Sequence, residues 1–295
     1  MTDWDDLRIF AALARAGSLS AAARALGVDH ATVGRRIAAL ERALGLRLID
    51  RLPRRAPLTS QGLAVAEALA PMEAAAIAVE RLARLAKQPA ATVRVSAPPA
   101  LAAYVIAPRL AVFQRAHPDV AIALAGAPEA AALDRGEADV AVRMGRPQQT
   151  GLVVKRIGSA RFGLYAAPEV ARAPRPDWRY IGFDEALDHV VSQRWLKALA
   201  GGRELSFRGS DIFSQAQAAR AGLGVVVLPR FVGDGDPGLV DLRVESPPPP
   251  IQHFWLLVYP DARRAPATRA VTAFLSETIG RACPIAGRSP PVSAA

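Results

Sequence analysis

Residues 14–45 read ARAGSLSAAARALGVDHATVGRRIAALERALG, in which glycines at positions 17, 27 and 45 follow helix-length segments. Ser18 and Asp29 stand where helix N-caps are needed, because their side-chain oxygens can accept the first unpaired N–H groups. A glycine after a helical segment is a typical stop, since it adopts the left-handed conformation without steric cost. The stretch therefore predicts a short helix ending at Leu26 and another running to about Leu44, the layout of a helix-turn-helix.

A first helix is expected upstream of this stretch. Asp3 can cap it, and its apolar face comprises Leu7, Phe10, Ala11 and Ala14. Residues 1–87 contain almost no β-branched runs, so this part of the chain is predicted to be mainly helical.

The third helix has two distinct faces. At about 100° per residue, its apolar side chains fall within about 60°: Val33, Ile37, Leu40 and Leu44. The opposite face carries Ala31, Arg35, Ala38 and Arg42, with His30 and Gly34 at one margin and Arg36 at the other. Small residues beside outward arginines allow a helix to approach base edges in a major groove. A solvated surface helix explains this pattern equally well when the helix is considered alone.

The segment after the third helix predicts a β-hairpin wing, with a strand over 46–51, a basic tip over 52–57 and a strand over 58–59. Between Arg24 and Ser60, eight arginines stand against three acidic residues, so +5 of the formal net charge of +10 lies here. Guanidinium groups make planar, bidentate contacts with phosphate and guanine edges. The wing and its charge therefore favour DNA over the surface-helix alternative.

A long helix is expected over residues 60–86, with Leu63, Ala66, Ala70, Ile77, Arg84 and Leu85 recurring at helical or heptad spacing. We expect nothing in its own domain to cover it, so that it pairs with a second copy. Pro71 removes one backbone hydrogen bond and predicts a kink or an interruption.

The composition changes near residue 90. Short apolar strands over 93–96, 120–124 and 138–142 alternate with helical stretches over 100–116 and 128–135. This alternation predicts βαβ units and a parallel sheet.

Residues 11–62 resemble the winged helix-turn-helix of LysR-type transcriptional regulators. The resemblance is carried by ARAGSLSAAA at 14–23, by Leu26-Gly27-Val28 and by Leu40-Glu41. It continues through FQRAHPDV at 113–120, GEADVA at 136–141, YAAP at 165–168 and AGLGVVVLP at 221–229. It implies a second, α/β part similar to a two-lobed type 2 periplasmic-binding-protein fold. We thus expect an all-α N-terminal part with a winged helix-turn-helix and a linker helix, then an α/β domain.

The expected boundaries follow from this resemblance. The DNA-binding domain is expected over 1–59, the linker and dimerisation helix over 60–91, and the effector-binding domain over 92–295. Within the last, lobe I is expected over 92–160 and 261–283, lobe II over 161–260, and a disordered tail over 284–295.

The resemblance and the helix faces together identify the candidate DNA-binding residues: Ser18, His30, Ala31, Gly34, Arg35, Arg51, Arg54 and Arg55. Members of the family commonly have Gln and Ser where this chain has His30 and Gly34. Direct base readout is therefore expected to depend mainly on Arg35 and His30.

Ligands in open α/β sheets bind beyond the carboxyl ends of strands. The candidate effector-binding residues are Pro98, Ala100, Leu101, Arg143, Ser210 and Asp211. Arg143 alternates out of phase with its buried neighbours and is expected at the sheet edge or the cleft, with a structural ion pair as the alternative. Asp211 is equally a candidate helix cap.

The expected effector is a small anionic or partly apolar molecule. The first N–H groups of the helix beginning near Pro99, from about Ala100 to Ala102, favour an anion, and Arg143 could bind a carboxylate. Pro98 and Ala100 lack the hydroxyl groups that family members often have at this loop, which favours a more apolar ligand.

Catalytic and metal-binding patterns are missing from the sequence. It has four scattered histidines, no HxxxH, HExxH, CxxC or GxSxG spacing, and a single cysteine, Cys283. We therefore expect no cofactor, no metal and no enzymatic activity. The acidic start and the lack of a long apolar run predict a cytoplasmic protein without a membrane partner.

The expected partners are a double-stranded DNA operator of two-fold symmetry, a small-molecule effector, further copies in a homodimer or homotetramer, and RNA polymerase. A function of a different class stays open: a cytosolic solute-binding or enzymatic α/β protein without operator recognition. Salt-dependent binding to the DNA beside its own gene would distinguish the two hypotheses.

Overall fold

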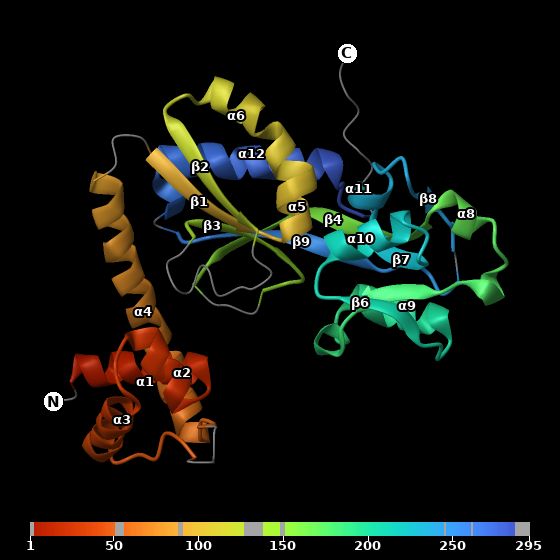
Figure 1. Cartoon of the computed structure of the whole chain (residues 1–295). Helices are drawn as coiled ribbons and strands as arrows, with labels where there is room; N and C mark the ends of the chain where they lie inside the picture. The colour runs from red at the N-terminus through yellow and green to blue at the C-terminus, as the bar shows by residue number, and fades with distance from the viewer. Residues whose placement is uncertain are drawn as a thin grey trace. The chain divides into compact units, whose positions relative to one another are not determined.

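A computed structural model describes residues 3–50, 56–87, 91–126, 138–147, 151–244, 246–260 and 262–286 (Figure 1). The chain forms two compact units, Met1–Ala86 and Lys87–Ala295. Each unit has its own hydrophobic interior and is described separately below.

In its described residues, the N-terminal unit contains the helices α1 (Trp4–Ala16), α2 (Leu19–Leu26), α3 (His30–Leu44) and α4 (Ser60–Lys87). The predicted caps are confirmed, because Asp3, Ser18 and Asp29 accept hydrogen bonds from the N–H groups of Asp5, Ala21 and Thr32, respectively. The glycines that follow α1, α2 and α3 adopt the left-handed conformation, with φ of 66–67°. The helix boundaries are therefore set by local capping chemistry.

The core of this unit lies among α1, α2 and α3. Val33, Ile37 and Leu40 are fully buried, as the face analysis predicted, and Leu44 is partly buried against them. Ile49 closes the core from the segment that follows α3.

The first half of α4 belongs to this same core. Leu69 is only 7% exposed, Val65, Ala66 and Met72 pack beside it, and Glu73 forms an ion pair with Arg15 of α1. The expectation that nothing in its own domain covers this helix is therefore wrong for residues up to Glu73. Helix α4 is continuous through Pro71, so the proline does not interrupt it. Leu69 and Met72, on either side of the proline, pack in the core and hold the helix in place.

The C-terminal unit contains a mixed sheet with the strand order β2-β1-β3-β9-β4-β7-β5-β6, in which β8 pairs with β4. The strands are β1 (Ala91–Ala97), β2 (Val120–Gly126), β3 (Val140–Met144), β4 (Val153–Ala166), β5 (Tyr180–Phe183), β6 (Leu205–Gly209), β7 (Val225–Pro229), β8 (Val240–Asp241) and β9 (Ile251–Val258). The pairs β1–β2, β1–β3, β5–β6 and β5–β7 are parallel, as the βαβ alternation predicted. The expectation of a parallel sheet is wrong for the sheet as a whole, because β9 pairs antiparallel with β3 and β4, and β4 pairs antiparallel with β7.

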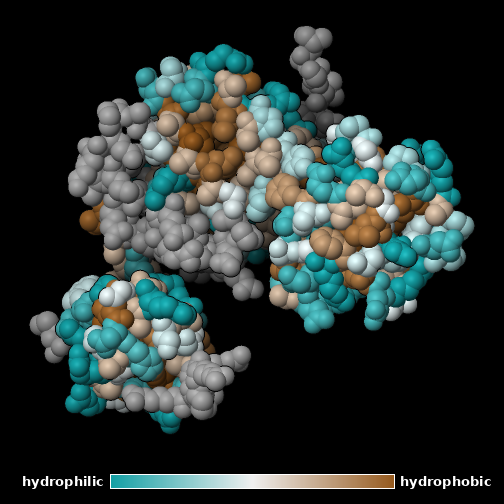
Figure 2. All heavy atoms as spheres, viewed as in Figure 1, coloured by the Kyte–Doolittle hydropathy of each residue, from teal (hydrophilic) through white to brown (hydrophobic). Residues whose placement is uncertain are grey.

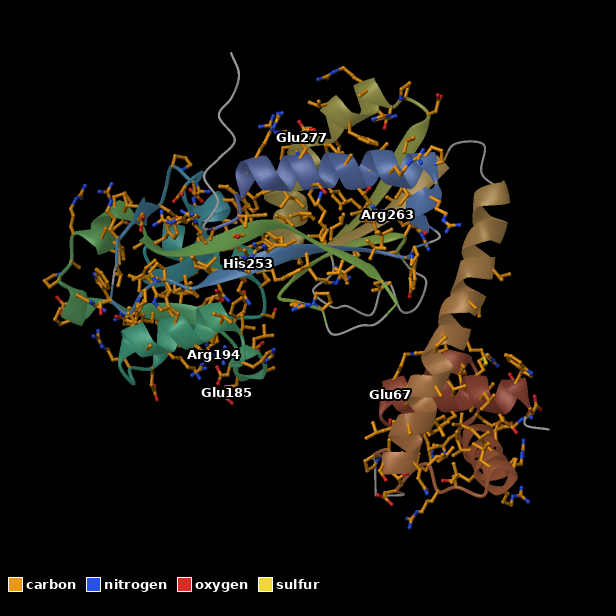
Figure 3. The ribbon with its side chains drawn as sticks, turned by 180° about the vertical axis from the view of Figure 1, so that it is seen from behind. Glu67, Glu185, Arg194, His253, Arg263 and Glu277 are labelled. Atoms are coloured by element: carbon orange, nitrogen blue, oxygen red, sulfur yellow. The ribbon has the colours of Figure 1, made fainter. Side chains whose placement is uncertain are left out.

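Two long antiparallel strands, β4 and β9, join the two ends of this sheet. The first part of β4 pairs with β9, and Phe162 to Tyr165 pair with β7. Strand β9 was expected in lobe II, but it also pairs with β3 from Val140↔Val258 to Met144↔Phe254. Strand β9 thus pairs with β3 and with the first part of β4, whereas β4 continues on to pair with β7. His253 lies on β9 (Figure 3), and its Nδ1 is 2.9 Å from Ser159 Oγ on β4.

Helices and turns cover this sheet: α5 (Pro99–Leu101), the π-helix η1 (Ala102–Ile106), η2 (Ala107–Arg109), α6 (Leu110–Ala116), α8 (Pro168–Ala171), η3 (Arg175–Asp177), η4 (Glu185–Leu187), α9 (Val191–Ala200), α10 (Ile212–Arg220), α11 (Arg230–Gly233), η5 (Ala262–Arg264) and α12 (Pro266–Ala282). The helical stretch expected over 100–116 is thus composite, and the one over 128–135 lies outside the described residues. Helix α12 packs against β1, β4 and η1.

The beginning of the expected tail is attached to the sheet, because the Ala286 N–H donates to Ser159 Oγ at 3.0 Å. Residues 287–295 lie outside the described part of the chain. In the described part, no helix is both long and apolar enough to cross a bilayer. No group of three or more His, Cys, Asp or Glu residues that could hold a metal ion occurs there either.

Candidate nucleic-acid interface and effector cleft

The outward face of α3 brings four predicted DNA-binding residues together. His30, Ala31 and Arg35 are exposed, and Gly34 lies between them with nothing within 4 Å of the place where a Cβ would stand. The guanidinium of Arg35 donates to Thr32 Oγ1 at 3.3 Å and, among the described residues, makes no ion pair. The face is therefore open, small and positively charged.

Ser18 has a different place, at the start of α2. Its Oγ accepts the Ala21 N–H at 3.2 Å, and the residue is partly buried. The structure thus identifies Ser18 as the cap of the helix that precedes α3.

Arg36 is held away from this open face by the acidic start of the chain. Its guanidinium lies 3.2 Å from Asp3, 3.1 Å from Asp6 and 3.9 Å from Asp5. The hydrogen bond to Asp6 is the main cause that raises the pKa of Arg36 above its ordinary value, and the charges of Asp6, Asp3 and Asp5 act in the same direction. Arg36 therefore fastens α3 to α1. The local sequence pattern did not indicate this contact, because Arg36 lies about thirty residues after its acidic partners.

The predicted wing is reduced, in the described residues, to the base of a hairpin. Ile49 and Leu58 form an isolated antiparallel bridge, and the Asp50 N–H donates to Pro57 O at 2.9 Å. Glu41 of α3 supports this base by accepting the Leu48 N–H at 2.8 Å. The expected strands are thus much shorter than predicted.

The three wing-tip arginines, Arg51, Arg54 and Arg55, lie outside the described residues. They remain predictions from the sequence.

On the effector side, α5 offers fewer donors than expected. The Ala102 N–H already donates to Pro98 O at 2.9 Å, so it is not available to an anion. Pro98 lies at the start of this single turn, the Leu101 side chain is completely buried, and Ala100 is also buried. Direct contact with a ligand at this turn would therefore involve mainly backbone groups.

Arg143 does not project to the sheet edge or into the cleft, and that expectation is wrong. The residue is 7% exposed, and its guanidinium donates to Ser96 Oγ at 2.8 Å and to the carbonyls of Ser96 and Val142 at 3.2 and 2.8 Å. Consecutive residues of β3 from Val140 to Arg143 are all buried, so both faces of this strand are covered and strand alternation does not expose every second residue. Arg143 connects β3 to β1.

At the start of α10, Asp211 acts as the helix cap that was its alternative role. Its Oδ1 accepts the N–H groups of Phe213 and Ser214, both at 2.8 Å. The backbone hydrogen bond from Ser214 is the main cause that holds the pKa of Asp211 below its ordinary value. Ser210, directly before it, is exposed.

Two aromatic rings that the sequence analysis missed meet between the lobes. Tyr104 of η1 and Phe213 of α10 are stacked, with ring centroids 6.0 Å apart and an interplanar angle of 13°. Ala100 packs into the same cluster as Tyr165 and Ala216. Here, therefore, the α5–η1 segment and α10 meet through apolar and aromatic surfaces. Tyr104 and Phe213 are too far apart in the sequence for a local pattern to indicate their contact.

Comparisons with known proteins agree with this two-part organisation. Residues 4–63 match the family described as bacterial regulatory helix-turn-helix protein, lysR family, and residues 86–280 match the LysR substrate binding domain. The Mau operon transcriptional activator of Paracoccus denitrificans is 30% identical over 279 residues, covering 93% of this chain and 96% of that protein. The HTH-type transcriptional regulator CrgA of Neisseria meningitidis (serogroup B strain) is 24% identical and covers 95% of this chain and 98% of its own length.

Solved structures show the same fold. The structure of CrgA has a TM-score of 0.54 at 24% identity and covers 96% of this chain and 99% of that one. ArgP from Mycobacterium tuberculosis has a TM-score of 0.57 at 19% identity and covers 95% and 98%, respectively. Both family matches are to domains of transcription regulators, which excludes the enzymatic alternative. The chain belongs to the LysR family of transcriptional regulators, which bind DNA through the helix-turn-helix and an effector through the second domain.

Proposed function

We propose that this regulator reads its operator with the open face of α3. The observation that carries the proposal is the contrast between two neighbouring arginines. Arg35 is exposed beside His30, Ala31 and Gly34, whereas Arg36 is engaged by the acidic residues of α1. An arginine free of ion pairs can bind a guanine edge in the major groove through two hydrogen bonds.

The other candidate residues are proposed to contact the phosphate backbone. Arg51, Arg54 and Arg55 belong to the wing tip, and Ser18 lies at the start of the helix preceding α3. Phosphate contacts orient a protein on the duplex but carry no sequence information.

The test compares specific and non-specific DNA binding. Arg35→Ala should cost about 1–3 kcal/mol at one base step per half-site and should relax discrimination there. Arg54→Ala is the matched control, because it should weaken binding to all sequences and reduce the salt dependence. Titrations of the DNA beside the protein's own gene and of a scrambled duplex measure both effects. An equal loss on both duplexes for Arg35→Ala would contradict this face assignment.

We propose that two copies pair through α4. Leu63 and Ala70 are exposed at heptad spacing, and Ile77 continues the same series. Ile77→Asp should therefore release monomers with weak operator affinity, because a charge in an apolar seam is costly and both half-sites must be bound together. Val79 is 66% exposed but off this series, so Val79→Asp is the control and should stay dimeric by light scattering. A dimeric Ile77→Asp variant would show that the seam lies elsewhere.

A homotetramer is proposed from a second apolar surface. Hydrophobic residues gather over α6 and β2 (Figure 2), where Val112 is 52% exposed and Ile122 and Leu124 are only partly buried. Strand β2 is also at the edge of the sheet. Exposed apolar patches of this kind mark protein–protein contacts. Val112→Asp should convert tetramers into dimers, as measured by light scattering at several protein concentrations.

The effector is proposed to bind beside the stacked rings of Tyr104 (η1) and Phe213 (α10), next to Ser210, which precedes α10, and to the backbone of Ala100. A small, mainly apolar ligand fits this chemistry best, because Arg143 is engaged by β1 and the contacts across the lobes are aromatic. Phe213→Ala should abolish the thermal shift that such an effector causes. The same shift in wild type and variant would contradict the site.

RNA polymerase is proposed as a further partner and the cytoplasm as the place of action. The support is the family, whose members act on transcription. Co-purification with RNA polymerase on promoter DNA, but not on a scrambled duplex, would test the contact with the polymerase.

A further inference from the structure

A cavity lies beside β4, where this strand crosses between the two lobes. It is separate from the proposed effector cleft. It has a volume of about 370 Å³, and its walls come from β4, from α11 and the residues after it, and from the end of α12. Cavities of this size fall at the lower end of the range for small-molecule sites. None of the residues assigned to the effector cleft lines it. A molecule bound here would contact elements of both lobes.

One wall of this cavity carries a positive charge. Arg161 of β4 lines it, and its guanidinium makes neither a hydrogen bond nor an ion pair with any residue that the structure describes. A guanidinium offers several N–H donors in a fixed planar arrangement that matches a carboxylate. Arg161 can therefore bind the anionic end of a ligand.

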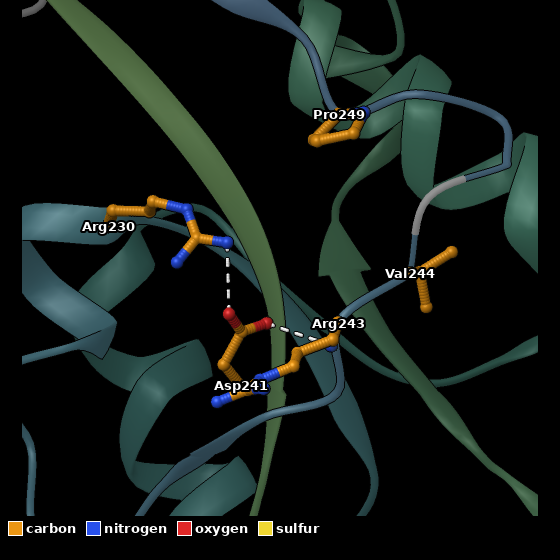
Figure 4. Close-up of a pocket in the computed structure, with 5 residues that line it drawn as sticks. All are labelled: Arg230, Asp241, Arg243, Val244 and Pro249. Carbon is orange, nitrogen blue, oxygen red and sulfur yellow. Dashed lines mark hydrogen bonds and ion pairs between the residues drawn. The ribbon is translucent and has the colours of Figure 1, made fainter.

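Asp234, on another wall of the cavity, supplies a negative charge. Its Oδ1 accepts from the Tyr165 hydroxyl and lies 3.4 Å from Arg230. Arg230 is shared with a second carboxylate, since it also lies 2.9 Å from Asp241 (Figure 4). Arg230 lines the cavity as well, but its single positive charge is shared by two aspartates, and the negative end of the α12 dipole lies at the same cavity. A cationic group would be favoured on this side.

Apart from Ser159, the remaining lining residues are mainly apolar. The Phe231 ring, Ala282 and Pro284 line the cavity between these charges. A purely ionic ligand would leave this surface without a partner, whereas a small hydrocarbon group would cover it.

From this arrangement we propose that the cavity binds a small zwitterion, an amino acid with an apolar side chain. Its carboxylate binds Arg161, its ammonium group faces Asp234, and its side chain packs on Phe231 and Pro284. This site is additional to the effector cleft and does not depend on it.

Calorimetric titration of the full-length protein with three related probes tests the charge requirement. L-Leucine carries both charges, 4-methylpentanoate lacks the ammonium group, and 3-methylbutylamine lacks the carboxylate. Leucine should bind at least tenfold more tightly than either analogue. Equal binding of leucine and 4-methylpentanoate would overturn the zwitterion assignment, and no heat with any probe at 10 mM would overturn the site.

Three variants locate the binding. Arg161→Gln should weaken leucine binding about tenfold to a hundredfold, which is the usual contribution of a hydrogen bond to a charged group. Arg194→Gln is the matched control, because this exposed arginine on α9 (Figure 3) does not line the cavity. Phe213→Ala removes one wall of the effector cleft and should leave leucine binding unchanged. Loss of binding in Phe213→Ala with normal binding in Arg161→Gln would assign leucine to the cleft and refute this proposal.

Discussion

Gly62, in the first turn of α4, is the position where adding one methyl group should harm the DNA-binding unit most directly. A Cβ placed there would overlap the Leu48 carbonyl oxygen and would lie 3.0 Å from the Leu48 carbonyl carbon. Both are backbone atoms of the hairpin base, where Leu48 O also accepts the Thr59 N–H at 3.0 Å. Gly62→Ala must therefore displace α4 from the hairpin base or break this contact.

Two opposing effects set the size of the change. Replacing glycine by alanine in a helix stabilises it by up to about 1 kcal/mol. Inserting a methyl group into a filled site costs about 1–3 kcal/mol, and the upper end applies here because backbone atoms cannot rotate away. We therefore expect a net loss of about 2 kcal/mol, near the maximum cost minus the gain in helix propensity.

Gly34→Ala on α3 is the matched control. It makes the same chemical change in a helix, but nothing stands within 4 Å of the new Cβ. It should stabilise α3 by about 0.5–1 kcal/mol while weakening operator binding, if this face approaches the DNA as proposed. The pair thus separates steric overlap from helix propensity.

Hydrogen exchange of the full-length protein, followed by mass spectrometry, gives the stability of this unit separately from the regulatory unit. A loss of about 2 kcal/mol corresponds to roughly thirtyfold faster exchange for amides that exchange by opening of the unit. Peptides from α1 and α3 should show it in Gly62→Ala, and peptides from α9 and α10 should not change. Unchanged or slower exchange in α1 and α3 would refute the steric argument.

Three further predictions concern stability, pH and reactivity. Tyr165→Phe removes the hydroxyl that donates to Asp234, and the free energy of unfolding should fall by about 1 kcal/mol in urea titrations. The backbone N–H of Thr32 holds the pKa of the Asp29 carboxyl below its ordinary value of 3.8, so this group stabilises α3 above pH 4 and the contribution disappears as the pH falls through the lowered pKa. Asp29→Asn should accordingly flatten the pH dependence of unfolding below pH 4, and an unaltered acid limb would contradict this assignment. Burial raises the pKa of Cys283 to about 12, so iodoacetamide at pH 8 should label the native protein far more slowly than the urea-unfolded chain, as mass spectrometry can measure.

The helices of the DNA-binding unit could be predicted closely because their signals are local. Ser18 and Asp29 each cap a helix by accepting an N–H three residues ahead, and the following glycines need only a change in their own backbone angle. The buried face of α3 depends on helical spacing alone. The parallel pairs of the regulatory sheet likewise follow from the alternation of strands and helices.

The candidate sites depended on contacts that no local pattern contains. Arg36 lies at the margin of the outward face of α3, yet it pairs with carboxylates about thirty residues earlier, because α1 and α3 pack side by side. Arg143 alternates like an edge residue, yet it hydrogen-bonds to Ser96, 47 residues away, because β3 lies inside the sheet.

Helix caps, helix faces and family motifs are formed by residues close together in the sequence. The sequence alone was therefore enough to predict the helix-turn-helix, the α/β regulatory domain and the class of function. Only the tertiary structure determined which charged side chains are available to a ligand, because their partners come from distant segments. A guanidinium binds the carboxylates and carbonyls that lie within hydrogen-bonding distance in the folded protein. Which of these groups are near it depends on packing across the whole unit. Among the described residues, Arg35 and Arg161 form no ion pair, whereas Arg36 pairs with Asp3 and Asp6, and Arg143 hydrogen-bonds to Ser96 of β1.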